Sequence, residues 1–208
     1  MDQAPIVERR YPIPAGTARA ELLALNSRFI GTAGYTASVA AARAFIAQVR
    51  AEFPDATHHC YAYLIGYGAS VTAGMSDDGE PAGTAGRPML AVLRGANLGD
   101  VTVVATRYFG GTLLGTGGLV RAYGDTVRAV LAVLPRGERV ELQPLRVRVA
   151  YSAYAAARRV LEQAGASIDQ EEFGAEVLIV ARLPADHYEQ ALARLREATA
   201  GQVRIEPG

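Results

Sequence analysis

The spacing of apolar residues over the first 140 positions predicts strands that alternate with helices. Residues 100–109 (D-V-T-V-V-A-T-R-Y-F) are apolar enough for a strand that is buried on both faces. Residues 37–53 place Val39, Ile46 and Val49 on one side of an amphipathic helix. The other expected elements are strands at 20–31 and 56–65 and helices at 88–97 and 118–134.

The last 70 residues follow a different order, in which strands and helices form a βαββαβ series. Residues 143–151 alternate as a strand, and 153–164 form a helix that closes at Gly165. Gly174 marks a turn between two further strands. The remaining predicted elements are strands at 166–173 and 175–183, a helix around Tyr188, Leu192 and Leu195, and a strand at 201–206. This order predicts a ferredoxin-like fold, which supports many functions and decides none of them.

The polar stretch at 134–144 (L-P-R-G-E-R-V-E-L-Q-P) separates these two patterns. Pro135 ends the preceding helix, and a new strand begins after the stretch. The predicted domains are therefore residues 1–138 and 139–208, both of the α+β class.

The composition indicates a globular protein of a reducing compartment. Half of the 208 residues are hydrophobic, and no run approaches the roughly 18 apolar residues of a membrane span. The first ten residues lack the basic start and apolar core of a signal peptide. Cys60 is the single cysteine, which excludes an intramolecular disulfide. A cytoplasmic protein without membrane partners is expected.

The charge balance argues against a polybasic surface for nucleic acids. The chain has 21 basic and 21 acidic residues, and every basic residue is arginine. Residues 1–140 hold 13 arginines and 11 acids, while residues 141–208 hold 8 arginines and 10 acids. A local basic groove remains compatible with these numbers.

A glycine-rich segment follows the strand at 100–109 and leads into the helix at 118–134 (G-G-T-L-L-G-T-G-G-L). Glycines before a helix N-terminus expose backbone N–H groups that favour an anion, and Arg107 and Arg121 are placed to clamp one. A nucleotide P-loop is excluded, because Thr116 stands where lysine is required. In the alternative, equally weighted interpretation, the glycines only serve turns and Arg121 pairs with Asp125.

An acidic segment, S-D-D-G-E, follows the strand at 56–65. The carboxylates of Asp77, Asp78 and Glu80 are hard ligands that suit Mg²⁺ or Ca²⁺. However, Asp-Gly is a preferred turn pair, and these acids can also cap N–H groups or pair with Arg87, Arg107 or Arg121. The turn is the favoured interpretation, and no metal or other cofactor is expected.

Two histidines and the cysteine lie in one predicted strand. Alternation sends His58 and Cys60 to one face and His59 to the other, together with Tyr61 and Tyr63. Zinc would need further ligands, and a Cys–His nucleophile lacks an orienting third group. Packing is the favoured role, and no catalytic residue is assigned.

Taken together, four segments of this sequence resemble the IMPACT family, also called the YigZ or UPF0029 family. They are N-S-R-F-I at 26–30, A-T-H-H-C-Y-A-Y at 56–63, S-D-D-G-E-P-A-G-T-A-G-R-P-M-L at 76–90, and T-R-Y-F-G-G-T-L-L-G-T-G-G-L-V-R-A-Y at 106–123. The resemblance covers essentially the whole chain. Asn26 departs from it, since the family pattern has lysine there, and a binding role of that lysine does not transfer.

The resemblance implies a first domain like domain 2 of ribosomal protein S5 and a second domain like the last domain of elongation factor G. Eukaryotic members regulate translation under stress by competing for a kinase co-activator, but they carry an extra N-terminal module that this sequence does not show, so their partner does not transfer. The expected function is therefore a translation-associated regulator that binds RNA, the ribosome or a translation factor. The alternatives are a protein-interaction module without nucleic-acid binding, and an enzyme for a phosphorylated metabolite or nucleotide.

The expected binding groove combines the two loops in the first domain, with an anion at the glycine loop. Its predicted residues are Arg28, His59, Asp77, Asp78, Glu80, Thr84, Arg107, Tyr108, Gly110, Gly111, Gly115, Gly117, Gly118 and Arg121.

Overall fold

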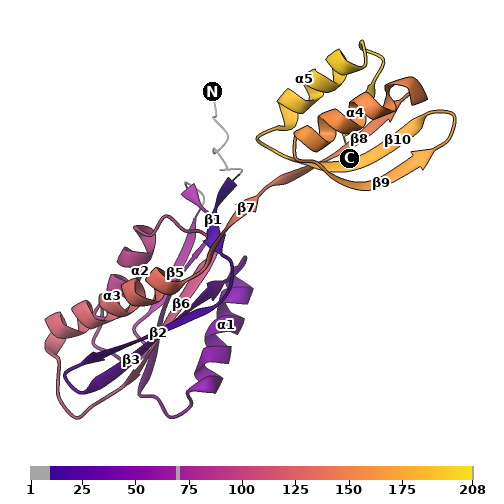
Figure 1. Ribbon diagram of the computed structural model, residues 1–208. Helices are drawn as coiled ribbons and strands as arrows, with labels where there is room; N and C mark the ends of the chain where they lie inside the picture. Colours follow the sequence, from indigo (N-terminus) through magenta and orange to yellow (C-terminus); the bar gives the residue numbers. More distant parts are fainter. Residues whose placement is uncertain (1–9, 69–70, 208) are drawn as a thin grey trace. The chain divides into compact units, whose positions relative to one another are not determined.

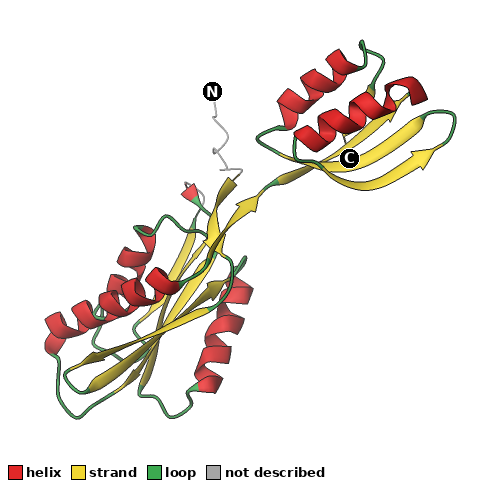
Figure 2. Cartoon of the chain, viewed as in Figure 1, coloured by secondary structure: helices red, strands yellow, loops and turns green. Residues whose placement is uncertain are grey.

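The computed structural model describes residues 10–68 and 71–207 of the chain. Packing contacts divide it into two domains, with the division in the chain falling between Arg139 and Val140. Both domains combine helices with antiparallel sheets (Figures 1 and 2), so the predicted α+β class is confirmed. Within the described ranges, no helix is both long and apolar enough to cross a membrane.

The first domain is built on a five-stranded sheet in the order β2-β3-β6-β4-β5. Helix α1 covers one face and helices α2 and α3 cover the other (Figure 1). The strands are β2 (Ala18–Ala24), β3 (Ser27–Tyr35), β4 (His58–Ile65), β5 (Thr72–Ser76) and β6 (Val101–Tyr108). The helices are α1 (Val39–Glu52), α2 (Gly86–Arg94) and α3 (Gly115–Val133).

Strand β6 lies at the centre of this sheet, between β3 and β4. Its side chains are buried from Val101 to Arg107, as the continuous apolar run predicts for a strand covered on both faces. The main core lies on the α2/α3 face and includes Phe29, Met89 and Tyr123. A smaller cluster of Ile46, Val49 and Val104 lies under α1.

Three parts of the first domain differ from the predictions. The expected strand at 20–31 is a hairpin of β2 and β3, which turns at Leu25 and Asn26 with positive φ angles of 41° and 67°. Strand β5 was not predicted, because its five residues mix small and polar side chains. The polar stretch at 134–144 contains strand β7 (Arg136–Val140), which pairs with the equally unpredicted β1 (Arg10–Pro14).

A buried carboxylate explains why this polar stretch is ordered. Asp100 is 1% exposed and accepts hydrogen bonds from the Tyr11 hydroxyl at 2.9 Å and the Gly66 N–H at 2.8 Å. Arg139 of β7 forms an ion pair with the same carboxylate at 2.5 Å. These contacts hold β1 and β7 against the domain. They are made by polar side chains, so the spacing of apolar residues did not predict the two strands.

The second domain is a four-stranded antiparallel sheet in the order β11-β8-β10-β9, with both helices on one face (Figure 2). This order and the βαββαβ series confirm the ferredoxin-like fold. Its elements are β8 (Leu142–Val149), α4 (Tyr151–Gln163), β9 (Ser167–Phe173), β10 (Val177–Pro184), α5 (Tyr188–Ala198) and β11 (Arg204–Pro207). Tyr151 begins α4, although the alternation assigned it to the preceding strand.

Candidate functional site

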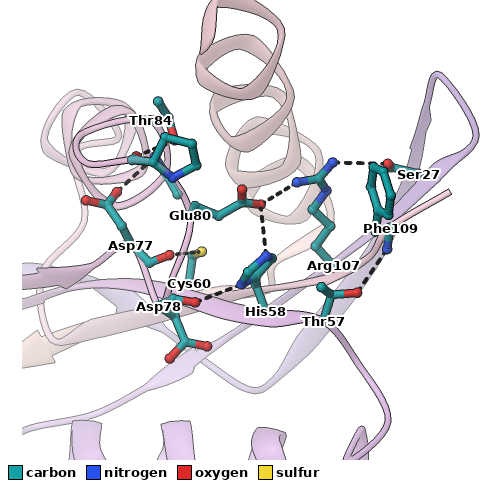
Figure 3. Close-up of polar contacts among 12 residues, drawn as sticks. Ser27, Thr57, His58, Cys60, Asp77, Asp78, Glu80, Thr84, Arg107 and Phe109 are labelled. Atoms are coloured by element: carbon teal, nitrogen blue, oxygen red, sulfur yellow. Dashed lines mark hydrogen bonds and ion pairs between the residues drawn. The ribbon is translucent and has the colours of Figure 1, made fainter. Parts of the chain in front are cut away.

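An ion pair between Glu80 and Arg107 joins the two loops that the sequence singles out. The Nη1 atom of Arg107 lies 2.6 Å from Oε1 of Glu80, and both side chains are almost fully buried, with exposures of 6% and 3% (Figure 3). Glu80 belongs to the loop between β5 and α2, and Arg107 lies near the end of β6. The predicted meeting of carboxylate and arginine therefore exists, inside the domain rather than in an open groove.

Two hydroxyl groups extend this buried pair into a network. The Tyr123 hydroxyl of α3 donates to the same Oε1 of Glu80 at 2.6 Å, and Nη2 of Arg107 donates to Ser27 Oγ at 3.2 Å. Burial raises the pKa of the Tyr123 phenol far above its ordinary value, so this group stays a donor. The Nε–H of Arg107 is buried without a hydrogen-bond partner among the described residues. One donor of this arginine is thus unused.

Asp77 organises the start of α2. Its carboxylate accepts hydrogen bonds from the backbone N–H groups of Gly83 at 2.8 Å, Ala85 at 3.0 Å and Gly86 at 2.8 Å. Burial alone would raise the pKa of Asp77, but these three N–H groups outweigh it and lower the pKa below its ordinary value. Asp77 therefore acts as the turn and capping residue that the preferred interpretation assigned to this loop.

Asp78 points towards the opposite face of the sheet, where α1 packs. Its carboxylate pairs with Arg50 of α1 and accepts the backbone N–H of His59 at 2.7 Å. The three carboxylates of the acidic loop therefore have separate partners. In the described part of the chain, no three His, Cys, Asp or Glu side chains lie close enough together to hold a metal ion.

His58 is held in a fixed orientation beside the buried pair (Figure 3). Its Nδ1 lies 2.8 Å from the carbonyl oxygen of Asp78, which only accepts, so Nδ1 carries a proton. In the neutral imidazole Nε2 is then the acceptor, and this atom lies 4.0 Å from Glu80 Oε1.

Cys60 has no properties of a nucleophile. The thiol is fully buried and donates to the carbonyl oxygen of Asp77 at 3.0 Å (Figure 3). Burial raises the pKa of the Cys60 thiol to about 12, so the thiolate is not formed near neutral pH. The packing role expected for this strand fits these contacts.

A cavity of about 400 Å³ opens beside the buried pair, and both loops line it. Apolar side chains make up much of its wall, while Glu80, Arg107, His58, Thr57 and Thr116 supply the polar side chains. The full lining consists of Thr57, His58, Glu80, Pro81, Arg107, Phe109, Leu113, Leu114, Gly115, Thr116 and Leu119. We call this cavity the loop pocket. It is large enough for an amino-acid side chain.

The glycine loop forms the rim of the loop pocket. Leu113 is 84% exposed and Phe109 is 45% exposed, which is unusual for residues of this size next to an apolar cavity. Arg121 is exposed and makes no ion pair within the described ranges, and Asp125 pairs with Arg128 instead. The suggested pairing of Arg121 with Asp125 is therefore wrong, and the role of Arg121 as a second clamp beside Arg107 stays a prediction.

The other predicted groove residues lie in three different places. Arg28 and Tyr108 are register partners of β3 and β6, where Arg28 pairs with Glu21 at 2.8 Å. His59 is buried on the α1 face and contacts Thr106 at 3.2 Å, on the far side of the sheet from Arg107. Thr84 donates to the carbonyl oxygen of Pro81 at 2.6 Å and stabilises the acidic loop.

The glycines of the predicted groove also separate into two groups. Gly110 is packed against the β2–β3 turn, because an added Cβ would lie 2.0 Å from the carbonyl oxygen of Asn26. Gly111, Gly115 and Gly117 face open space, with no atom within 4 Å of such a Cβ. Gly118 lies against the side chain of Leu114. Only the open group has backbone that a ligand could approach.

The sequence predictions omitted the apolar residues of the loop pocket. Leu113 and Leu114 form the one apolar pair in a loop otherwise made of glycine and threonine. A pair of large apolar residues in a turn-rich segment is a signal for a binding surface, because such segments are normally polar. His58 was weighed as a zinc ligand, a nucleophile partner and a packing residue, and its place beside Glu80 depends on the fold.

Comparisons with known proteins cover both domains. Residues 25–131 match the Impact N-terminal domain, and residues 147–202 match a domain of unknown function (DUF1949). The IMPACT family member YigZ of Escherichia coli (strain K12) is 42% identical over 181 residues, which are 86% of this chain and 89% of that relative.

One solved structure gives the same result for the fold. A crystal structure of a hypothetical protein is 39% identical and superimposes with a TM-score of 0.68, over 96% of this chain and 98% of its own. The two-domain translational regulator Yih1 aligns with 23% identity and a TM-score of 0.37, over 64% of this chain and 49% of its own. That second likeness is too distant to carry an argument about function.

Proposed function

The chain belongs to the IMPACT family, and we propose that it is a translation-associated regulatory protein that docks onto a protein component of the translation machinery through the loop pocket. The link to translation comes from the role of eukaryotic family members that the resemblance implies. The loop pocket supplies the chemistry of the contact.

The observation that carries a protein partner is the combination of an apolar cavity with internally neutralised charges. Glu80 and Arg107 pair with each other, and Asp77 and Asp78 are bonded to the loop backbone and to Arg50. The large side chains exposed on the rim are apolar, with Leu113 at 84% and Phe109 at 45% exposure. Such a surface favours an apolar group of a protein over a phosphate backbone.

The arginines of the first domain support the same choice. At least seven of its 13 arginines form ion pairs with carboxylates of the same domain. RNA binding needs cations that are free to displace the counterions of phosphate groups. Arginines already paired with carboxylates do this poorly, so RNA is the weaker candidate for the loop pocket.

The test is co-sedimentation of the full chain with ribosomes and their associated factors, using two leucine variants. Leu113→Asp places a charge on the rim at a position that is 84% exposed, so folding is expected to be preserved. Leu23→Asp is the matched control, because Leu23 is 71% exposed in the same domain and does not line the loop pocket. We expect Leu113→Asp to lose at least tenfold in bound fraction and Leu23→Asp to retain binding.

Salt distinguishes a protein contact from an RNA contact in the same experiment. Phosphate contacts weaken steeply between about 50 and 200 mM salt, whereas an apolar contact does not. Binding that survives the higher salt and depends on Leu113 supports the proposal. Absence of the wild-type chain from every ribosomal fraction, or binding that salt abolishes and Leu113→Asp leaves intact, contradicts it.

A further inference from the structure

The backbone of the glycine loop offers unused hydrogen-bond donors beside the loop pocket. Thr57 Oγ1 and Ser27 Oγ accept the N–H groups of Phe109 and Gly110. In the part of the chain that the structure describes, the backbone N–H groups of residues 111–117 donate no hydrogen bond to an acceptor outside α3. Gly111 and Gly115 have positive φ angles of 80° and 68°. Three glycines of this run, Gly111, Gly115 and Gly117, have no atom within 4 Å of an added Cβ, so there is room for a ligand beside them.

Helix α3 adds its own N-terminus to this donor-rich rim. The helix is 19 residues long and begins at Gly115, and its N-cap residue Leu114 has no side chain that caps the free N–H groups. The helix dipole makes this end favourable for negative charge. Most helix starts satisfy these groups with Ser, Thr, Asp or Asn, so an apolar N-cap leaves them available.

Arg107 provides an independent sign of a missing acceptor. Its side chain lines the loop pocket, is more than nine-tenths buried, and has an Nε–H without a partner among the residues described. Buried donors are normally satisfied, because an unmade bond costs about 1–3 kcal/mol. Phe109 lies across the guanidinium, with 5.4 Å from Cζ to the ring centroid, and is itself half exposed.

We propose that the glycine loop and the loop pocket together bind the C-terminal residue of a partner polypeptide. The free carboxylate lies on the N–H groups of the loop and the start of α3, and the apolar side chain of that residue fills the loop pocket. The inference rests on the proposed function, since it specifies which part of the partner docks. The exposed Leu113 then covers the preceding residues of the peptide.

The charge of the site favours a carboxylate over a phosphate. Among the described residues that line the loop pocket, Arg107 is the only arginine, and Glu80 already neutralises it. A phosphate group carries a charge of about −1.5 to −2 at pH 7 and would face the carboxylate of Glu80 without a free counter-charge. A single negative charge suits backbone N–H donors and a helix dipole, which carry only about half an elementary charge.

The experiment compares one peptide in two forms on the intact chain. The probes are acetyl-Ala-Ala-Leu with a free carboxylate, the same peptide as its C-terminal amide, and 4-methylpentanoate as a small acid with the same apolar group. Binding is followed by ¹H–¹⁵N NMR shifts, which report on the Gly111–Gly117 amides directly. We expect the acid peptide to shift these amides and the amidated peptide to bind at least tenfold more weakly.

Two variants of Thr116 test the location of the carboxylate. Thr116 is exposed, lines the loop pocket and lies in the first turn of α3, where an acidic residue is favourable for the helix. Thr116→Asp therefore preserves folding, places a negative charge on the proposed carboxylate position, and is expected to raise Kd at least tenfold. Thr116→Asn has nearly the same side-chain shape as Thr116→Asp but no charge, and is expected to bind the acid peptide at least tenfold more tightly than Thr116→Asp does.

Each other outcome contradicts the inference. If the acid and amide peptides bind equally well, the site does not recognise the free carboxylate. If 4-methylpentanoate binds as tightly as the acid peptide, the site recognises a small acid and not a polypeptide C-terminus. Wild-type affinity of Thr116→Asp places the ligand elsewhere, and stronger binding of inorganic phosphate than of the peptide reverses the charge argument. The proposed function fails separately, because co-sedimentation that depends on Leu113 stands even if no free C-terminus binds.

Discussion

Replacing Glu80 by alanine is expected to destabilise the first domain by about 3–5 kcal/mol. The change leaves the guanidinium of Arg107, 6% exposed, and the fully buried Tyr123 hydroxyl without their acceptor. Removing one partner of a buried ion pair costs about that much, because the remaining charge has lost both its water and its counter-charge. Such a loss is a large part of the 5–15 kcal/mol that stabilises a typical domain.

The assay is urea unfolding of the full chain, followed by NMR signals assigned separately to each domain. The chain has no tryptophan, so fluorescence does not report on the first domain specifically. We expect the midpoint for residues of β6 to fall while the midpoint for the second domain stays unchanged. Tyr123→Phe removes only one hydrogen bond of the network, and we expect it to lower the free energy of unfolding by about 1–3 kcal/mol.

A double substitution separates the charge from the shape of the site. Replacing both Glu80 and Arg107 by methionine removes the unpaired charge, so the double variant is expected to be more stable than Glu80→Ala. An ordinary surface substitution changes the free energy of unfolding by up to about 0.5 kcal/mol. If Glu80→Ala changes it by no more than this, the Glu80–Arg107 pair does not hold the two loops together.

Three further predictions concern the same loops. The pKa of Asp77 is lowered in the folded state, so its ionised carboxylate stabilises the fold above the unfolded pKa of about 4. This stabilisation is lost as the pH falls through the folded pKa. Asp77→Asn should therefore flatten the acid limb of a profile of unfolding free energy against pH. Cys60, with a buried thiol of pKa about 12, should react with a thiol reagent at pH 8 only at the rate of unfolding, and fast modification of the native chain would contradict its burial. Gly110→Ala should destabilise the first domain by about 1–3 kcal/mol, because the added Cβ meets the carbonyl oxygen of Asn26. Gly117→Ala lies in open space within α3 and should be neutral or stabilising by up to about 1 kcal/mol. Thermal unfolding of the two variants measures both effects.

The sequence determined the class of the fold and most of its elements, because burying one face of a helix or strand makes apolar residues recur at a regular spacing. The run at 100–109 became the central strand β6, and the βαββαβ series became a ferredoxin-like sheet. The hairpin of β2 and β3 was missed, because its turn at Leu25 and Asn26 lacks the Asn-Gly pair that normally marks such turns. Strand β7 was missed because ion pairs, not apolar side chains, hold it.

The two unusual loops were visible in the sequence, but their chemistry depended on which partners the fold supplied. Asp77, Asp78 and Glu80 are neighbours in the chain, yet one caps α2, one pairs with α1 and one pairs with Arg107. A strand sends successive side chains to opposite faces, and a turn reorients them again, so proximity in sequence did not predict a shared site. Local patterns record how a segment is buried, whereas the loop pocket arises only where segments far apart in the chain meet.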